Sequence, residues 1–120
     1  MTKKGSAIMN HNMKLNKLPF ELISKEEKQI EYRLNDKKRQ QLKIGDTITF
    51  TKLPDEQEQL TVLITDLKKY KNLLEMYSDS FDHYLEKYYQ IPEDVVKDTT
   101  YYKEEDINEY GCLAIHIKKI

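Results

Sequence analysis

The sequence predicts an α+β domain, with a small, mostly antiparallel sheet that curls toward a barrel and helices packed around it. Hydrophobic and polar residues alternate, with the period of half-buried strands, in four segments: 29–35, 47–52, 59–67 and 112–118. Residues 70–89 instead carry hydrophobic side chains at spacings of three and four, which is typical of one face of a helix. The last strand must therefore return past helices to pair with the earlier strands.

The first elements predicted are a tail, a helix and a strand. Residues 1–12 show no hydrophobic period, so we expect a disordered N-terminal tail before a single domain over residues 13–120. Pro19 favours the start of a short helix over residues 20–28, because proline is tolerated in the first turn. The strand over residues 29–35 follows directly.

The middle of the chain is expected to form two strands and then two helices. Gly45 permits a tight turn before the strand at 47–52, and the strand at 59–67 has hydrophobic residues on both sides. The sequence Ser-Asp-Ser at 78–80 is expected to divide residues 70–89 into two helices, with Ser80 capping the second.

The last part of the chain is predicted to contain one further helix and the final strand. Pro92 is expected to end the helical section. A short helix over residues 103–109 then stops before Gly111, which suits the position after a helix. Alternating hydrophobic residues over 112–118 close the chain as a strand.

Composition limits the class of protein. The 120 residues suffice for one domain, with 38% hydrophobic and 34% charged residues, and the aromatic side chains include nine tyrosines but no tryptophan. No hydrophobic run is long enough to span a membrane, and the single cysteine, Cys112, rules out an internal disulfide. We therefore expect a cytoplasmic protein without a membrane partner.

Charge is distributed unevenly along the chain. Residues 1–53 hold 12 Lys and Arg against 6 Asp and Glu, whereas residues 54–120 hold 8 against 15. A basic first half could form an electropositive face for phosphates. Alternatively, each half solvates its own surface and the fold interleaves them. The sequence leaves both readings open, and it leaves the oligomeric state open as well.

The strand at 29–35 carries the strongest functional signal. Glu31 and Arg33 alternate with its hydrophobic residues and therefore share a polar face, and Lys28 precedes them closely enough to join that row. Such a row could hold a planar, hydrogen-bonding ligand or carry out proton chemistry on one. Glu31 would stabilise the Lys28 ammonium, which favours Lys28 as an electrostatic anchor over a catalytic base. For Arg33, a structural ion pair with Glu31 remains an alternative to ligand contact.

Four motifs together resemble an ASCH domain, a small β-barrel of the PUA-like superfold. They are Pro19-Phe20-Glu21-Leu22-Ile23, Lys28-Gln29-Ile30-Glu31-Tyr32-Arg33, Lys43-Ile44-Gly45-Asp46, and the closing segment from Tyr110 to Ile117. The resemblance spans about residues 13–118. It implies a groove in which Lys28, Glu31 and Arg33 face a ligand, and in the wider superfold that ligand is usually RNA or a modified base. We therefore expect RNA or a modified nucleoside as the partner.

The resemblance also implies an enzymatic alternative. Some ASCH relatives are amidohydrolases that deacetylate N4-acetylcytidine with a Lys matching Lys28, a Thr matching position 31 and a later glutamate. Here Glu31 takes the place of that Thr, and Glu26 stands where the family favours Gly. Both departures favour binding over catalysis. If the chain is an enzyme, the catalytic candidates are Lys28, Glu31 and Glu75. A protein-interaction module that uses the tyrosine-rich acidic half is a third alternative.

Other residues are candidates for the rim of the groove. Lys37, Lys38 and Arg39 form the densest basic cluster, which suits phosphate contacts but also an ordinary solvated loop. Tyr70 could stack on a base or begin the hydrophobic stripe of the next helix, and we favour the helix. Tyr101, with its neighbour at 102, is a candidate for closing the groove or for filling the core.

The sequence gives no signal for a metal or a cofactor. His11, His83 and His116 lack the spacing of metal ligands. The chain has only three glycines, and they form no phosphate-binding loop. We therefore expect neither a metal ion nor a cofactor.

Overall fold

The computed structural model describes residues 7–120, which form one five-stranded sheet and four α-helices. The strands are β1 (Asn10–Leu15), β2 (Ile30–Leu34), β3 (Thr47–Lys52), β4 (Gln59–Tyr70) and β5 (Cys112–Lys119). The helices are α1 (Lys17–Ser24), α2 (Leu73–Asp79), α3 (Pro92–Asp98) and α4 (Glu104–Tyr110), with 3-10 turns η2 (Arg39–Gln41) and η3 (Leu85–Lys87). The predicted α+β class is confirmed.

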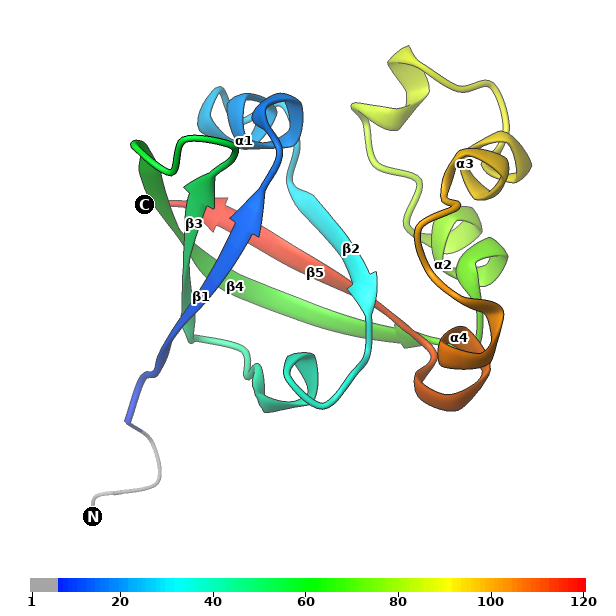
Figure 1. Ribbon diagram of the computed structural model, residues 1–120, viewed down its shortest axis with the longest axis horizontal. Helices are drawn as coiled ribbons and strands as arrows, with labels where there is room; N and C mark the ends of the chain where they lie inside the picture. Colours follow the sequence, from blue (N-terminus) through cyan, green and yellow to red (C-terminus); the bar gives the residue numbers. More distant parts are fainter. Residues whose placement is uncertain (1–6) are drawn as a thin grey trace.

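The sheet curls into a half-barrel with the strand order β1-β3-β4-β5-β2 (Figure 1). Three of its pairings are antiparallel, and β1 runs parallel to β3. A bulge between Ile64 and Asp66 interrupts the register of β4 with β5, and bulges of this kind increase local bend and twist. Among residues 7–120, β1 and β2 form the two edges of the sheet and do not pair with each other. The half-barrel is therefore open between β1 and β2.

One hydrophobic cluster packs against each face of the sheet. The inner cluster fills the curl and includes Phe50, Ile64 and Ile115, each at most 1% exposed. The outer cluster joins β2 and β5 to α2 and α3 through residues such as Met76 and Val95. In Figure 1, α2, α3 and α4 stand together beside β2, while α1 lies at one end of the curled sheet. None of the helices in residues 7–120 is long and hydrophobic enough to cross a bilayer.

The start of the domain differs from the prediction. Asn10, His11 and Asn12, expected in a disordered tail, belong to β1, and the rest of that predicted tail up to residue 6 lies outside the described residues. Only Met13 and Leu15 of β1 are buried, so the hydrophobic period of this strand is too short to identify. Its pairing partner β3 also lies far along the chain, which no local pattern reveals.

The helical section also differs from the prediction. Tyr70 ends β4 and does not begin the helical stripe. Residues 71–89 form α2 and only one further 3-10 turn, so the second predicted helix and its Ser80 cap are wrong. The chain after α2 is instead hydrogen-bonded to the start of β2, because the Asp82 carboxylate accepts from the backbone N–H groups of Gln29 and Ile30. Pro92 begins α3 and does not end a helix, which fits the tolerance of proline in a first turn.

Gly111 offers a direct test of the junction between α4 and β5. Its φ is +71°, and a Cβ at this position would lie 2.7 Å from the backbone oxygen of Tyr70. We expect Gly111→Ala to lower the free energy of unfolding by about 2–3 kcal/mol, since backbone strain adds to a contact that must be relieved. Gly45→Ala is the matched control, because φ is +97° but no atom lies within 4 Å. Equal losses in urea unfolding would show that the Tyr70 contact is unimportant.

Candidate functional site

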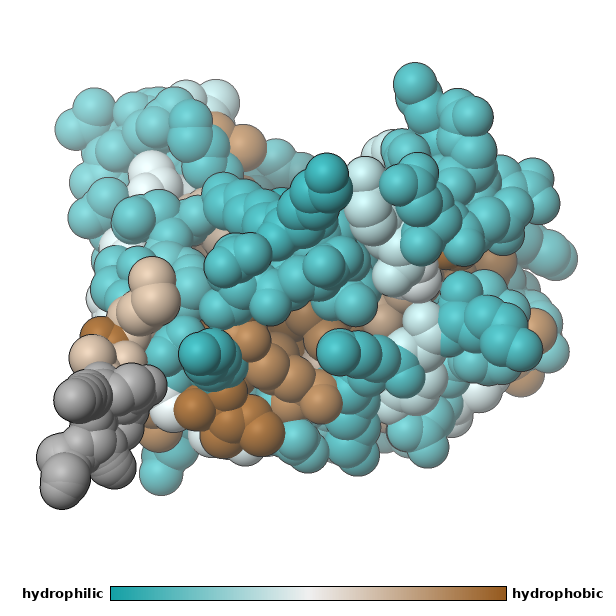
Figure 2. Space-filling model, turned by 90° about the horizontal axis from the view of Figure 1, so that it is seen from below, coloured by the Kyte–Doolittle hydropathy of each residue, from teal (hydrophilic) through white to brown (hydrophobic). Residues whose placement is uncertain are grey.

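A cleft of about 720 Å³ lies between the sheet and the helices, within the size range of small-ligand sites. One wall comes from the end of β1 and from α1, the other from η3, α3 and the residues after it, and β2 lies between them. The surface is indented at the upper edge of Figure 2, between the sheet and the helices. The polar and aromatic lining residues are Lys14, Asn16, Lys28, Glu31, Tyr32, Arg33, Tyr77, Tyr84, Tyr88, Tyr89, Asp98, Thr99, Tyr101 and Tyr102.

The three residues of the sequence motif converge on this cleft. Lys28 and Glu31 are buried, at 3% and 6% exposure. The Lys28 Nζ atom lies 3.2 Å from Glu31 Oε1, and the Arg33 Nε atom donates to Glu31 Oε2 at 2.6 Å. Each oxygen of the carboxylate thus contacts a different cation. The structure joins these residues into a continuous row of two ion pairs, here called the charged row.

Local backbone geometry places the charged row. Glu31 and Arg33 are two residues apart on β2 and therefore point to the same face of the strand. Lys28 comes from the turn after α1, where its N–H donates to the Leu22 carbonyl and Glu26 adopts a left-handed φ of 62°. Glycine adopts such a φ most easily, which gives a physical reason for the glycine that the resemblance leads one to expect at position 26.

Arg33 also ties the two open edges of the sheet together. Its Nη2 atom donates to the backbone carbonyl of Lys14 at 3.0 Å, so that a side chain on β2 reaches the end of β1. No strand pairing joins these edges within residues 7–120. The guanidinium therefore bridges the opening of the half-barrel and lies in the cleft at the same time.

The ammonium of Lys28 is enclosed by acceptors and aromatic rings. Besides Glu31, its Nζ atom contacts the backbone carbonyl of Ile30. It lies 5.0 Å from the ring centre of Tyr32 and 4.7 Å from that of Tyr84, within the range of cation–π attraction. Four groups thus fix the position of one charged atom at the floor of the cleft.

Burial and mutual attraction act in opposite directions on the ionisable groups of the charged row. Burial lowers the pKa of Lys28, although Glu31 opposes this shift. Burial alone would raise the pKa of Glu31, but Lys28 and Arg33 outweigh it and hold that pKa below its ordinary value of 4.5. For Arg33, burial is again opposed by Glu31, and the pKa is raised. Glu31 and Arg33 are therefore both charged near neutral pH.

Tyrosines supply the aromatic wall of the cleft. Tyr88 and Tyr101 are 56% and 71% exposed, so their rings are open to a ligand. Burial raises the pKa of Tyr102 to about 12, and burial together with Asp98 raises that of Tyr89 to about 12. Both hydroxyl groups therefore stay protonated at neutral pH, and that of Tyr89 donates to Asp98 at 2.8 Å.

None of the members of the basic cluster predicted for the rim lines the cleft. Lys37 and Lys38 are exposed in the turn after β2. Arg39 begins η2 and contacts Asp36 through Nη1 at 3.4 Å. Burial and then the charge of Arg33 lower the pKa of Arg39.

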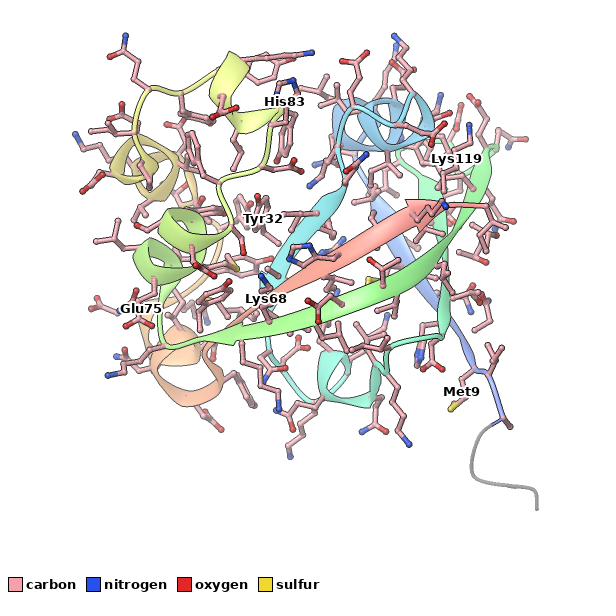
Figure 3. All side chains as sticks on the ribbon, turned by 180° about the vertical axis from the view of Figure 1, so that it is seen from behind. Met9, Tyr32, Lys68, Glu75, His83 and Lys119 are labelled. Atoms are coloured by element: carbon pink, nitrogen blue, oxygen red, sulfur yellow. The ribbon has the colours of Figure 1, made fainter. Side chains whose placement is uncertain are left out.

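Two other predicted site residues do not reach the cleft. The Tyr70 hydroxyl donates to Asp79 at 2.5 Å, and its ring packs on the outer hydrophobic cluster. Glu75 is exposed in the first turn of α2, where it accepts from Lys71 N–H and where its own N–H donates to the Asn72 side chain. Figure 3 shows Glu75 at the outer edge of the helical side, away from Tyr32. Glu75 is thus part of a helix cap.

Sequence reasoning missed several residues of the cleft. Tyr84 and Tyr88 belong to the hydrophobic stripe that was taken for a helix face, and the stripe does not distinguish a core ring from a cleft ring. Lys14 lies at the end of an unpredicted strand, and it carried no recognisable signal. Within residues 7–120 no group of His, Cys, Asp and Glu side chains could hold a metal ion.

The ionised carboxylates make stability depend on pH. Glu31 and Asp46 are buried. Despite burial, Lys28 and Arg33 lower the pKa of Glu31 below 4.5, and hydrogen bonds from the His11 side chain and from the Met9 and Lys43 N–H groups lower that of Asp46 below 3.8. A lowered pKa stabilises the fold above the ordinary value and loses that contribution as pH falls through the folded-state value. We expect the free energy of unfolding, measured with urea at fixed salt, to fall steadily below about pH 4.5. The decline should be shallower in Asp46→Asn, and an unchanged slope would exclude Asp46 as a source.

Comparison with known proteins identifies the family. The model of the ASCH domain matches residues 13–120. The crystal structure of hypothetical protein PH0355 is 34% identical, with a TM-score of 0.78 over 93% of this chain and 100% of that one. The solution structure of protein PF0455 from Pyrococcus furiosus is 30% identical, with a TM-score of 0.69 over 93% and 98% of the two chains. No curated protein matches. The chain therefore belongs to the ASCH domain family.

Proposed function

We propose that this protein binds RNA, or a nucleotide-like ligand, in the cleft above the charged row. The observation that carries the proposal is that Lys28 and Arg33 both pair with the buried carboxylate of Glu31 at the floor of a cleft walled by tyrosines. Aromatic rings stack on nucleobases with little dependence on sequence. The resemblance to RNA-binding PUA-like domains points to the same class of ligand.

The charged row is suited to recognition because its geometry is fixed before a ligand arrives. Arg33 uses Nε and Nη2 within the protein, and a guanidinium has five N–H groups in a planar fork. Its remaining N–H groups can donate to a base edge or a phosphate. Since Glu31 holds the fork in place, little side-chain entropy is lost when a ligand binds.

Arg33→Ala tests the proposal. We expect the affinity for single-stranded RNA and for nucleosides to fall about tenfold or more at fixed salt, since a bidentate base contact is worth about 1–3 kcal/mol. Lys38→Ala is the matched control, because Lys38 is exposed and outside the cleft. This variant should bind RNA slightly more weakly than the wild type and bind nucleosides equally well. If Arg33→Ala binds every ligand as the wild type does, with its fold verified by circular dichroism, the charged row is not the ligand site.

The lowered pKa of Lys28 favours a second candidate function, hydrolysis of the amide in N4-acetylcytidine or a similar acylated nucleoside. In this reaction the Lys28 amine would accept a proton from the attacking water, and the products would be cytidine and acetate. Incubation with N4-acetylcytidine followed by chromatography tests this function, with Lys28→Met as the inactive control. The absence of cytidine after hours with excess enzyme would exclude it.

A further inference from the structure

The backbone of β2 is hydrogen-bonded to the sheet on one side only. Its neighbour is β5, which lies between β2 and the rest of the sheet. Ile117 N–H donates to the Gln29 carbonyl at 3.0 Å, and Asn35 N–H donates to the Gly111 carbonyl at 2.9 Å. Because an antiparallel ladder bonds at every second residue, the odd-numbered residues between them also face β5. The backbone groups of the even-numbered residues therefore point to the free edge.

Contacts of Ile30 support this assignment. Its N–H donates to the Asp82 carboxylate at 3.1 Å, and its carbonyl accepts from Lys28 Nζ. Neither partner belongs to β5. The next residue with this orientation is Tyr32. Outside the ladder with β5, no hydrogen bond to its backbone N–H or carbonyl is formed within residues 7–120. Tyr32 thus presents a donor and an acceptor at the edge of the sheet.

This free edge runs along the cleft. Glu31 and Arg33 point to one face of the strand and Tyr32 to the other, yet all three line the same cleft. A cavity that touches both faces of one strand must pass its edge. Across the cleft, the Lys14 carbonyl on β1 is held by Arg33. The backbone of Tyr32 is therefore available to a ligand between the two open edges.

We propose that the backbone N–H and carbonyl of Tyr32 read the Watson–Crick edge of a single, unpaired nucleobase. This inference rests on the proposed function and specifies its ligand class. In an extended residue these two groups point in the same direction, and the Watson–Crick edge of each standard base places a donor beside an acceptor. The exposed rings of Tyr88 and Tyr101 flank the cleft for stacking. A base that is already paired in a duplex is excluded, because its edge is occupied.

Methylated nucleosides test this reading of the base edge. Uridine, 3-methyluridine and 5-methyluridine are titrated into the ¹⁵N-labelled full-length protein, and guanosine and 1-methylguanosine provide a purine pair. Uridine and 5-methyluridine are expected to shift the Tyr32 amide resonance and slow its hydrogen exchange. Methylation of N3 removes the donor, so 3-methyluridine should bind about tenfold or more weakly. The same loss is expected for 1-methylguanosine. Without ligand, the Tyr32 amide should exchange faster than those of Glu31 and Arg33.

Two outcomes overturn the inference and leave the proposed function intact. In the first, the N-methylated nucleosides bind as tightly as their parents. In the second, nucleosides shift the Arg33 side chain but not the Tyr32 amide. If no nucleoside and no single-stranded RNA perturbs any resonance of the cleft, the proposed function fails and this inference fails with it.

Discussion

Glu31→Gln is expected to lower the free energy of unfolding by about 3–5 kcal/mol, because it leaves the buried Lys28 ammonium without its counter-charge. The side chain keeps its shape, so the loss measures charge and not volume. Arg33 loses the same partner but retains the Lys14 carbonyl and is partly exposed. Urea unfolding at pH 7 measures the loss. Nucleoside affinity should fall in parallel, because a neutral amide holds the fork of Arg33 less firmly than the carboxylate does.

Glu27→Gln is the control for that variant. Glu27 pairs with Lys87 at 3.3 Å, but both side chains are more than 40% exposed. Exposed pairs of this kind contribute about 0–1 kcal/mol. A loss for Glu31→Gln no larger than for Glu27→Gln would show that water reaches the charged row, and that its burial does not govern its energy.

The strands that the sequence predicted well are those in which the hydrophobic period extends over six residues or more. The strand predicted at 47–52 matches β3 residue for residue, and the final strand was one residue too short. β1 was missed because its pairing with β3 is non-local and most of its side chains are exposed. Periodicity identifies which face of a segment is buried, but it does not identify the partner that buries it.

The charged row could be predicted for the same reason. The alternation of β2 places Glu31 and Arg33 on one face, and no long-range information is needed for that. The aromatic wall could not be predicted, because Tyr84 and Tyr88 occupy positions that fit a helical stripe. Tertiary hydrogen bonds to Asp82 overrode that local pattern. The cleft therefore combines a floor set by local sequence with a wall set by long-range contacts.

A double-mutant cycle over Lys28 and Glu31 separates the stability of the charged row from its role in binding. Lys28→Met replaces the buried ammonium by a side chain of similar length, and Glu31 remains paired with Arg33 at 2.6 Å. Once Met occupies position 28, Glu31→Gln no longer leaves a buried charge without its partner. The double variant should therefore lose about 1–3 kcal/mol less stability than the sum of the two single variants.

Nucleoside binding is expected to follow a different pattern from stability across the wild type, the two single variants and the double variant. The double variant recovers part of the stability, but it lacks the carboxylate that holds Arg33, so nucleoside affinity should remain as low as in Glu31→Gln. If affinity recovers together with stability, the charged row serves only to maintain the fold. If the two stability losses add within about 0.5 kcal/mol, Glu31 acts through Arg33 alone and Lys28 is an independent group. Recovery of stability without recovery of binding is the result that a ligand-holding role requires, because only then does the carboxylate do more than neutralise a buried charge.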